Sequence, residues 1–253
     1  MRVSELYEGP VRGQDVCIIG LGPSLRVFPK NFFDHKFCIL LKDAWKLLPN
    51  AGPVAFSNNV VYLDEDSPNP LPYQIVKCRH KGAQNPERTD NHVPWDSPRF
   101  YCFSYREQPW DLVSHHDEKT LWQEPDFYWN YPGGNVAIFA IQFAVLAGAR
   151  SISLVGCDCG ELLNMEYVSP EISENREKGK ALFDKRNGRR AGTRKVTKPK
   201  RDRHDYVGYL NGMQIIRKRA LRDYGVPVVS VVPFMGLFEY EEQFRLMLKE
   251  ERK

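Results

Sequence analysis

The chain has 253 residues, of which 42% are hydrophobic and 27% charged, as is ordinary for a globular protein of one large domain or two small ones. No run approaches the roughly 18 apolar residues that a membrane span needs, and the N-terminus has no apolar signal segment. Six scattered cysteines do not suggest a disulfide scaffold. We therefore expect a cytoplasmic protein without a membrane span.

Charge is distributed unevenly along the chain. The net charge is +4, from 36 Lys+Arg and 32 Asp+Glu. Residues 174–204 hold 13 basic and 4 acidic residues, a net of +9, which leaves 23 basic and 28 acidic residues, a net of −5, for the rest. The sequence therefore predicts a mildly acidic body that carries one basic, mobile, lid-like segment; the alternatives are an arm that binds nucleic acid and a solvated insertion without a role.

The N-terminal part alternates short apolar runs with turns. Strands are predicted at 15–20 (DVCIIG), 36–41 (KFCILL) and 53–58 (PVAFSN), and one or two helical turns at 43–48. This rhythm favours a parallel α/β sheet. Residues 64–132 are less regular, with many prolines and four tryptophans, and we expect there an irregular, aromatic-rich insertion of short strands and loops over one face of the sheet.

Regular elements return after residue 132. Residues 136–147 are apolar at 11 of 12 positions, which is typical of a helix buried on all sides. A strand is then predicted at 151–156, a helix at 205–225, a strand at 226–232 and an amphipathic helix at 239–251. The whole chain is thus predicted to form a single Rossmann-like α/β domain over 1–253, with a mostly parallel sheet and helices on both faces.

The turn GLGPSL follows the first predicted strand, where α/β folds bind ligands. Gly20 and Gly22 would let backbone N–H groups approach a phosphate, and Ser24 offers a hydroxyl at a helix start. Leu25 stands where the dinucleotide fingerprint has its third glycine, which argues against NAD. Asp43, after the second strand, could hold a ribose, and the alternative is a tight strand-to-helix turn without a ligand.

Two further motifs precede or follow predicted elements of the second half. Gly133, Gly134 and Asn135 lead into the buried helix and would form a second anion site, and the alternative is an ordinary Pro-Gly-Gly turn without a ligand. Asp158 follows the strand at 151–156, where a carboxylate can hold a ribose, a sugar hydroxyl or Mg²⁺. The alternative to a ligand-binding role is that Asp158 is an ordinary residue at the end of a strand. Zinc binding by Cys157 and Cys159 is not supported, because the sequence has no second cysteine pair at a suitable spacing.

Other catalytic signatures are absent from the sequence. It has no G-x-x-x-x-G-K-[ST] phosphate loop and no G-x-S-x-G nucleophile elbow. His204, at the end of the basic segment, is a candidate base, with His115 and His116 as rivals.

Three blocks of the chain resemble a known superfamily, and together they cover about half of it. They are VCIIGLGPSL, GGNVAIFAIQFAVLAGARSISLVGCDCG and HDYVGYLNGMQIIRKRALRDYGVPVVSVVP. These blocks are similar to the motility accessory factor glycosyltransferases and the archaeal-type 6-hydroxymethylpterin diphosphokinases, and more distantly to bacterial sialyltransferases.

The resemblance implies a Rossmann-like domain that binds a nucleotide and transfers a sugar or a diphosphoryl group. By position it implies that the nucleotide is bound by Gly20, Gly22, Pro23, Ser24, Gly133, Gly134 and Asn135. It places Asp158 at the acidic position after the next strand and His204 near the histidine base of the sialyltransferases. Leu21 stands where the sialyltransferases have asparagine, which argues against CMP-sialic acid as the donor.

Three functions follow as hypotheses. The first is a glycosyltransferase that moves a sugar from a nucleotide-sugar donor to a hydroxyl of a small-molecule or glycan acceptor, with Asp158 and His204 as catalytic candidates. The second is a diphosphokinase in which Asp158 would hold Mg²⁺ and ATP would be the donor. The third is a nucleic-acid-binding or DNA-modifying transferase that uses residues 174–204. The cations expected to contact phosphate or nucleic acid are Arg189, Arg190, Arg194 and Lys195.

Overall fold

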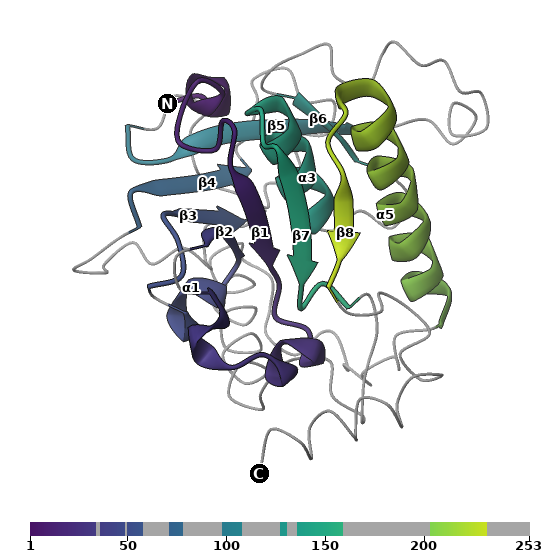
Figure 1. The fold of residues 1–253 in the computed structure, drawn as a ribbon. Helices are drawn as coiled ribbons and strands as arrows, with labels where there is room; N and C mark the ends of the chain where they lie inside the picture. Colours follow the sequence, from purple (N-terminus) through teal and green to yellow (C-terminus); the bar gives the residue numbers. More distant parts are fainter. Residues whose placement is uncertain are drawn as a thin grey trace, which may run out of the picture.

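A computed structural model describes most of the regular elements of the chain (Figure 1). The described residues are 1–33, 36–48, 50–57, 71–77, 98–107, 127–130, 136–158 and 203–231.

The structure is built on an eight-stranded sheet in which all neighbouring strands are parallel. The strands are β1 (Asp15–Ile19), β2 (Phe37–Leu41), β3 (Val54–Ser57), β4 (Tyr73–Lys77), β5 (Tyr101–Glu107), β6 (Phe127–Asn130), β7 (Ser151–Val155) and β8 (Val228–Ser230). Their order across the sheet is β6-β5-β4-β3-β2-β1-β7-β8. An all-parallel sheet flanked by helices is the arrangement of α/β, Rossmann-like folds.

The helices and 3-10 helices lie between the strands in sequence. The α-helices are α1 (Ala44–Leu47), α3 (Val136–Leu146) and α5 (Arg203–Tyr224), and the 3-10 helices are η1 (Val3–Leu6), η2 (Pro23–Val27) and η3 (Lys30–Phe33). Among the described residues no helix is both long enough and apolar enough to cross a membrane.

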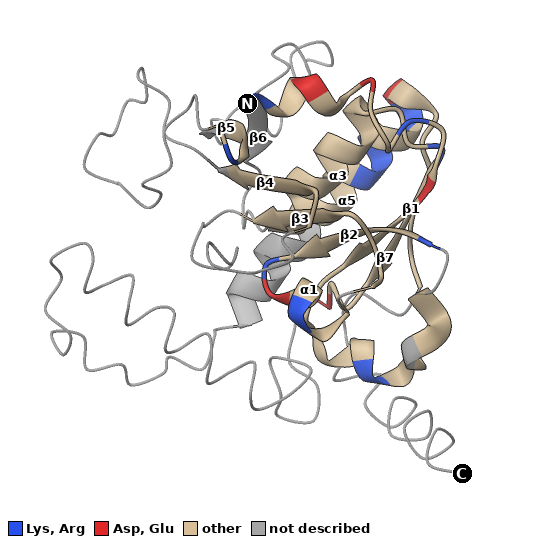
Figure 2. Ribbon diagram, turned by 90° about the vertical axis from the view of Figure 1, so that its left-hand side faces the viewer, with Lys and Arg blue, Asp and Glu red and all other residues tan. Residues whose placement is uncertain are grey.

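Successive side chains of each strand point to opposite faces of the sheet, so the core is divided into clusters on the two faces. In β1, Val16 and Ile18 belong to the cluster that contains α3 and α5, whereas Cys17 and Ile19 pack with Leu25 of η2 and other residues on the opposite face. Successive side chains of a strand point to opposite faces, and burial of both faces gives the continuous apolar runs seen in the sequence. The strands are accordingly almost free of charge (Figure 2).

The order of the strands reverses beside β1. The chain moves outward from β1 through β2 to β6, returns through α3, and places β7 and then β8 on the other side of β1. Because parallel crossovers are right-handed, this reversal puts α3 and α5 on one face and η2, η3 and α1 on the other. The topological switch point therefore lies between β1 and β7.

Most predicted elements are confirmed, and one placement is wrong. Strands at 15–19, 37–41, 54–57, 151–155 and 228–230 and the helices α3 and α5 match the sequence predictions. The strands within 64–132, however, do not lie over a face of the sheet, because β4, β5 and β6 extend the sheet itself beyond β3. The predicted helix at 239–251 and nearly all of the basic segment lie outside the described residues.

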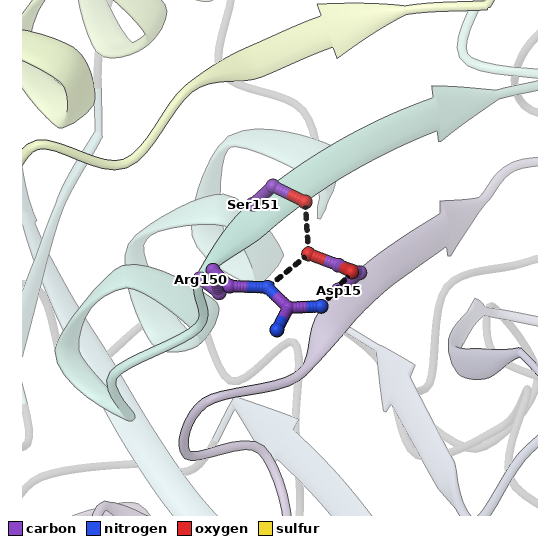
Figure 3. Close-up of polar contacts among 3 residues, drawn as sticks. All are labelled: Asp15, Arg150 and Ser151. Atoms are coloured by element: carbon purple, nitrogen blue, oxygen red, sulfur yellow. Dashed lines mark hydrogen bonds and ion pairs between the residues drawn. The ribbon is translucent and has the colours of Figure 1, made fainter.

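At their amino ends, β1 and β7 are joined by an exposed polar cluster (Figure 3). Arg150 donates two hydrogen bonds to the carboxylate of Asp15, one of them from Nε to Oδ1 at 2.8 Å, and Ser151 Oγ donates to the same Oδ1 at 2.7 Å. The hydrogen bonds from Arg150 and then Ser151 lower the pKa of Asp15 to about 2.

Four described cysteines differ in their bonding. Cys17, Cys38 and Cys157 are free thiols, and Cys102 is disulfide-bonded.

Candidate functional site

The carboxyl ends of β1 and β7 meet at the switch point, where open α/β sheets bind their ligands. The last strand residues, Ile19 and Val155, are paired in register. The ladder continues into the following turns, since the N–H of Gly20 donates to Val155 O at 2.8 Å and the N–H of Gly22 to Gly156 O at 2.7 Å. The glycine turn predicted from the sequence is thus tied to the residues after β7.

Glycine is required where these two turns cross. A Cβ atom on Gly20 would lie 2.3 Å from the carbonyl oxygen of Gly156, closer than real Cβ contacts allow. Gly156 has φ +62°, in the left-handed region, and its own Cβ would lie 2.7 Å from Gly20 O. The two backbones therefore touch without any side chain between them.

Asp158 connects the turn after β7 to the turn after β1. Its Oδ2 accepts a hydrogen bond from the backbone N–H of Ser24 at 2.7 Å, and its Oδ1 accepts from the Ser24 hydroxyl. Both side chains are buried, with 3% of Asp158 and 1% of Ser24 exposed. Pro23 and Ser24 open η2, so the carboxylate caps the start of this 3-10 helix across 134 residues of sequence.

Burial and hydrogen bonding act on the Asp158 carboxyl in opposite directions. Burial disfavours the charged form and raises its pKa, while the two hydrogen bonds from Ser24 lower it. Burial is the larger effect, and it raises the pKa of Asp158 to about 6.

The turn uses most of its hydrogen-bond donors internally. The N–H groups of Gly20, Gly22 and Ser24 donate to β7 and the residues after it, and that of Leu25 donates to Gly22 O at 3.1 Å. Pro23 has no N–H, so among the described residues only the backbone N–H of Leu21 in this turn lacks a partner. Most N–H groups that the sequence analysis assigned to a phosphate therefore donate to acceptors of the protein itself.

The ends of β2 and β3 add further polar residues to the same edge of the sheet. Asp43, predicted as a ribose contact, directly follows β2 at the start of α1 and is 6% exposed. Before it, Lys42 has φ +54°, a conformation that is strained for a residue with a side chain, and its N–H donates to Phe56 O at 2.9 Å. Ser57, the last residue of β3, is fully buried.

Sequence reasoning did not identify Lys42, Ser57 or Gly156 as part of this edge. Gly156 and Ser57 could have been found, because each lies where a predicted apolar strand ends. Lys42 carries no such signal, since lysine is not a residue that favours positive φ.

The remaining predicted site residues cannot be joined to this arrangement. Gly133, Gly134 and Asn135 lie outside the described residues, although α3 begins directly after them at Val136. Arg189, Arg190, Arg194 and Lys195 also lie outside the described residues. His204 falls in the first turn of α5, and its side chain is not among those described.

The surroundings of Asp158 do not fit a magnesium ion. Mg²⁺ needs near-octahedral oxygen ligands and usually keeps several waters. Both oxygens of Asp158 already accept hydrogen bonds from Ser24, and the side chain is buried. Within the described ranges, no group of three histidine, cysteine or acidic side chains is placed to hold a metal.

Comparison of the chain with protein-family models, with curated proteins and with solved structures finds no match.

Proposed function

We propose that the protein is a nucleotide-dependent transferase, and specifically a glycosyltransferase, that binds its nucleotide-sugar donor at the carboxyl ends of β1 and β7. One observation carries this proposal: the glycine turn Gly20–Ser24 lies at the topological switch point of an all-parallel sheet. In open α/β sheets, ligands bind outside the carboxyl ends of the strands at such a point.

The shape of the turn supports a nucleotide site other than that of a dinucleotide dehydrogenase. The dinucleotide fingerprint runs from its strand directly into an α-helix whose N-terminus holds the pyrophosphate. Here the turn runs into η2, a 3-10 helix of five residues, and Leu25 replaces the third glycine. The Leu21 N–H is the donor that this turn would offer to a phosphate.

The proposed reaction is a direct displacement at the anomeric carbon of the donor sugar. The acceptor hydroxyl oxygen forms a bond to this carbon while the bond from the carbon to the leaving phosphate oxygen breaks. A general base takes the proton of the acceptor hydroxyl, and we assign this role to His204. Cations of the basic segment, among them Arg189, Arg190, Arg194 and Lys195, would neutralise the leaving phosphate.

A paired assay tests this function. The protein is first screened by thermal shift against UDP, GDP, CMP, ADP and ATP. It is then incubated with sugar conjugates of the nucleotides that stabilise it, with release of the nucleoside phosphate as the readout, and separately with ATP and a hydroxymethylpterin, with AMP release as the readout.

We expect stabilisation by at least one nucleotide and release of nucleoside phosphate from its sugar conjugate. AMP release from ATP in the presence of the pterin would replace the glycosyltransferase with a diphosphokinase. Absence of stabilisation by every nucleotide would contradict the proposal as a whole.

A further inference from the structure

The contacts of Asp158 point to a role other than catalysis or metal binding. Its carboxylate lies directly against the backbone of the turn, because a Cβ atom on Gly22 would be 2.4 Å from Oδ2. Each of its oxygens accepts one donor of Ser24. Because only 3% of Asp158 is exposed, little of its carboxylate is accessible to an acceptor hydroxyl or a metal ion.

We propose that Asp158 is a positioning residue, which acts on the nucleotide through the turn Gly20–Ser24 rather than by touching the substrate. This inference rests on the proposed nucleotide site. The carboxylate fixes the N–H and the hydroxyl of Ser24, and Gly156 O fixes the N–H of Gly22. Together they set the direction of the intervening backbone, including the peptide that carries the Leu21 N–H.

The hydrogen-bond pattern makes asparagine the informative substitution. In Asp158→Asn, the side-chain carbonyl can still accept from the Ser24 N–H, and the amide NH₂ can donate to Ser24 Oγ. The shape is kept and only the charge is lost. A catalytic base or a metal ligand would lose its chemistry in this variant, whereas a positioning residue keeps its bonds.

Alanine at position 158 removes both hydrogen bonds to Ser24, which asparagine keeps. Asp158→Ala leaves the N–H and the hydroxyl of Ser24 buried without their acceptor, and Ser24→Ala removes one of the two bonds. We therefore expect the order of nucleotide affinity to be wild type, then Asp158→Asn, then Ser24→Ala, then Asp158→Ala.

The test measures two quantities on the four proteins at a temperature where all are folded. The first is the dissociation constant for whichever of UDP, GDP, CMP, ADP or ATP stabilises the wild type. The second, which needs no ligand, is amide hydrogen exchange in peptides that cover residues 20–28. Asp15→Ala serves as the control, because it breaks the tie between the same two strands at their opposite ends (Figure 3).

We expect Asp158→Ala to weaken nucleotide binding at least about tenfold and to speed exchange in residues 20–28. Asp158→Asn should stay within about threefold of wild type in affinity and keep its slow exchange, as should Asp15→Ala. A merely stabilising role would leave the affinity of folded Asp158→Ala unchanged.

Two further results would overturn the inference. One is a loss in Asp158→Asn as large as that in Asp158→Ala, which would assign a role to the charge itself. The other is wild-type exchange of residues 20–28 in Asp158→Ala. If no nucleotide binds the wild type, the proposed function fails and with it the nucleotide role of Asp158, while the exchange data still decide whether Asp158 holds the turn.

Discussion

Asp158 is the ionisable residue whose environment most clearly predicts a dependence of stability on pH. Its pKa is about 6 in the folded protein, against an ordinary value of 3.8 for an aspartate side chain. Between these two values the folded state binds the proton more readily than the unfolded state, so the free energy of unfolding rises as the pH falls. The charged form, present above pH 6, carries the burial penalty.

We predict that the wild type gains stability relative to Asp158→Asn when the pH is lowered from 7.5 to 4.5. The gain is at most about 3 kcal/mol, since each unit of pKa shift corresponds to about 1.36 kcal/mol. Urea unfolding of both proteins at the two pH values measures it. Both pH values lie above the range in which Asp15, whose pKa is lowered to about 2, is protonated and stops contributing to the free energy of unfolding. Equal changes in the two proteins would show that Asp158 is not buried as described.

Lys42 supplies a second prediction at the scale of one residue. Its φ of +54° is strained by about 1–2 kcal/mol in any residue with a Cβ atom, and glycine removes this strain. Glycine also costs about 0.5–1 kcal/mol in the entropy of the chain. Lys42→Gly should therefore be more stable than Lys42→Ala by up to about 1.5 kcal/mol.

The alanine variant is the matched control for Lys42, because both substitutions remove the same side chain and whatever contacts it makes. Urea unfolding of the two variants gives the comparison directly. An alanine variant as stable as the glycine variant, or more stable, would show that the backbone at Lys42 is not strained. Strain of this kind is concentrated at functional sites, which is a further reason to include Lys42 in the candidate edge.

At the scale of elements, the pattern of apolar residues predicts the buried helix correctly. The run at 136–147 was predicted to be a helix apolar on all sides, and every residue from Val136 to Val145 of α3 is buried. Its one polar member, Gln142, is 1% exposed and donates from Nε2 to Ile138 O at 3.3 Å. A buried polar group inside such a helix is tolerated because it finds a partner in the preceding turn.

The strands that sequence analysis misplaced lack this kind of signal. β4 has the sequence YQIVK, in which Gln74 is 8% exposed although glutamine does not indicate a buried strand. Its position is set by its pairing with β3, from Val54 with Tyr73 to Ser57 with Val76. Pairing of this kind leaves no signal in the sequence of a short segment, so the sequence alone does not show that the strands within 64–132 extend the sheet.

The candidate site likewise contains parts that the sequence predicts and one contact that it does not. Both of its turns could be predicted, because GLGPSL and the residues after SISLVG each follow an apolar strand. The bond between Ser24 and Asp158 could not, since it joins residues 134 positions apart and depends on the order of the strands. The sequence therefore located the parts of the site, and the fold determined which partner each part has.

At the scale of the whole molecule, the two ends of the β1–β7 pair differ in character. The amino ends carry the exposed ion pair of Asp15 and Arg150, which solvent and salt screen. The carboxyl ends carry the buried bonds between Ser24 and Asp158 and the glycine contacts around Gly22. This contrast supports the proposal that the ligand binds at the carboxyl edge, and it agrees with a supporting role for the amino edge.

Two glycines allow this assignment to be tested with matched substitutions. A Cβ atom on Gly22 would lie 2.4 Å from Asp158 Oδ2, and one on Gly52, which precedes β3 at the opposite edge, would lie 2.4 Å from Cys38 O. Each alanine variant therefore introduces a clash of similar closeness, and only one of them lies at the proposed site. Ser24→Ala, which adds no atoms, is the substitute if Gly22→Ala does not fold.

The deciding measurement is the thermal shift produced by the nucleotide that stabilises the wild type, determined for Gly22→Ala and Gly52→Ala side by side. If the nucleotide binds at the carboxyl ends of β1 and β7, Gly22→Ala loses the shift while Gly52→Ala keeps it, even though both variants melt below the wild type. A full wild-type shift in folded Gly22→Ala, or loss of the shift in Gly52→Ala alone, would contradict the account.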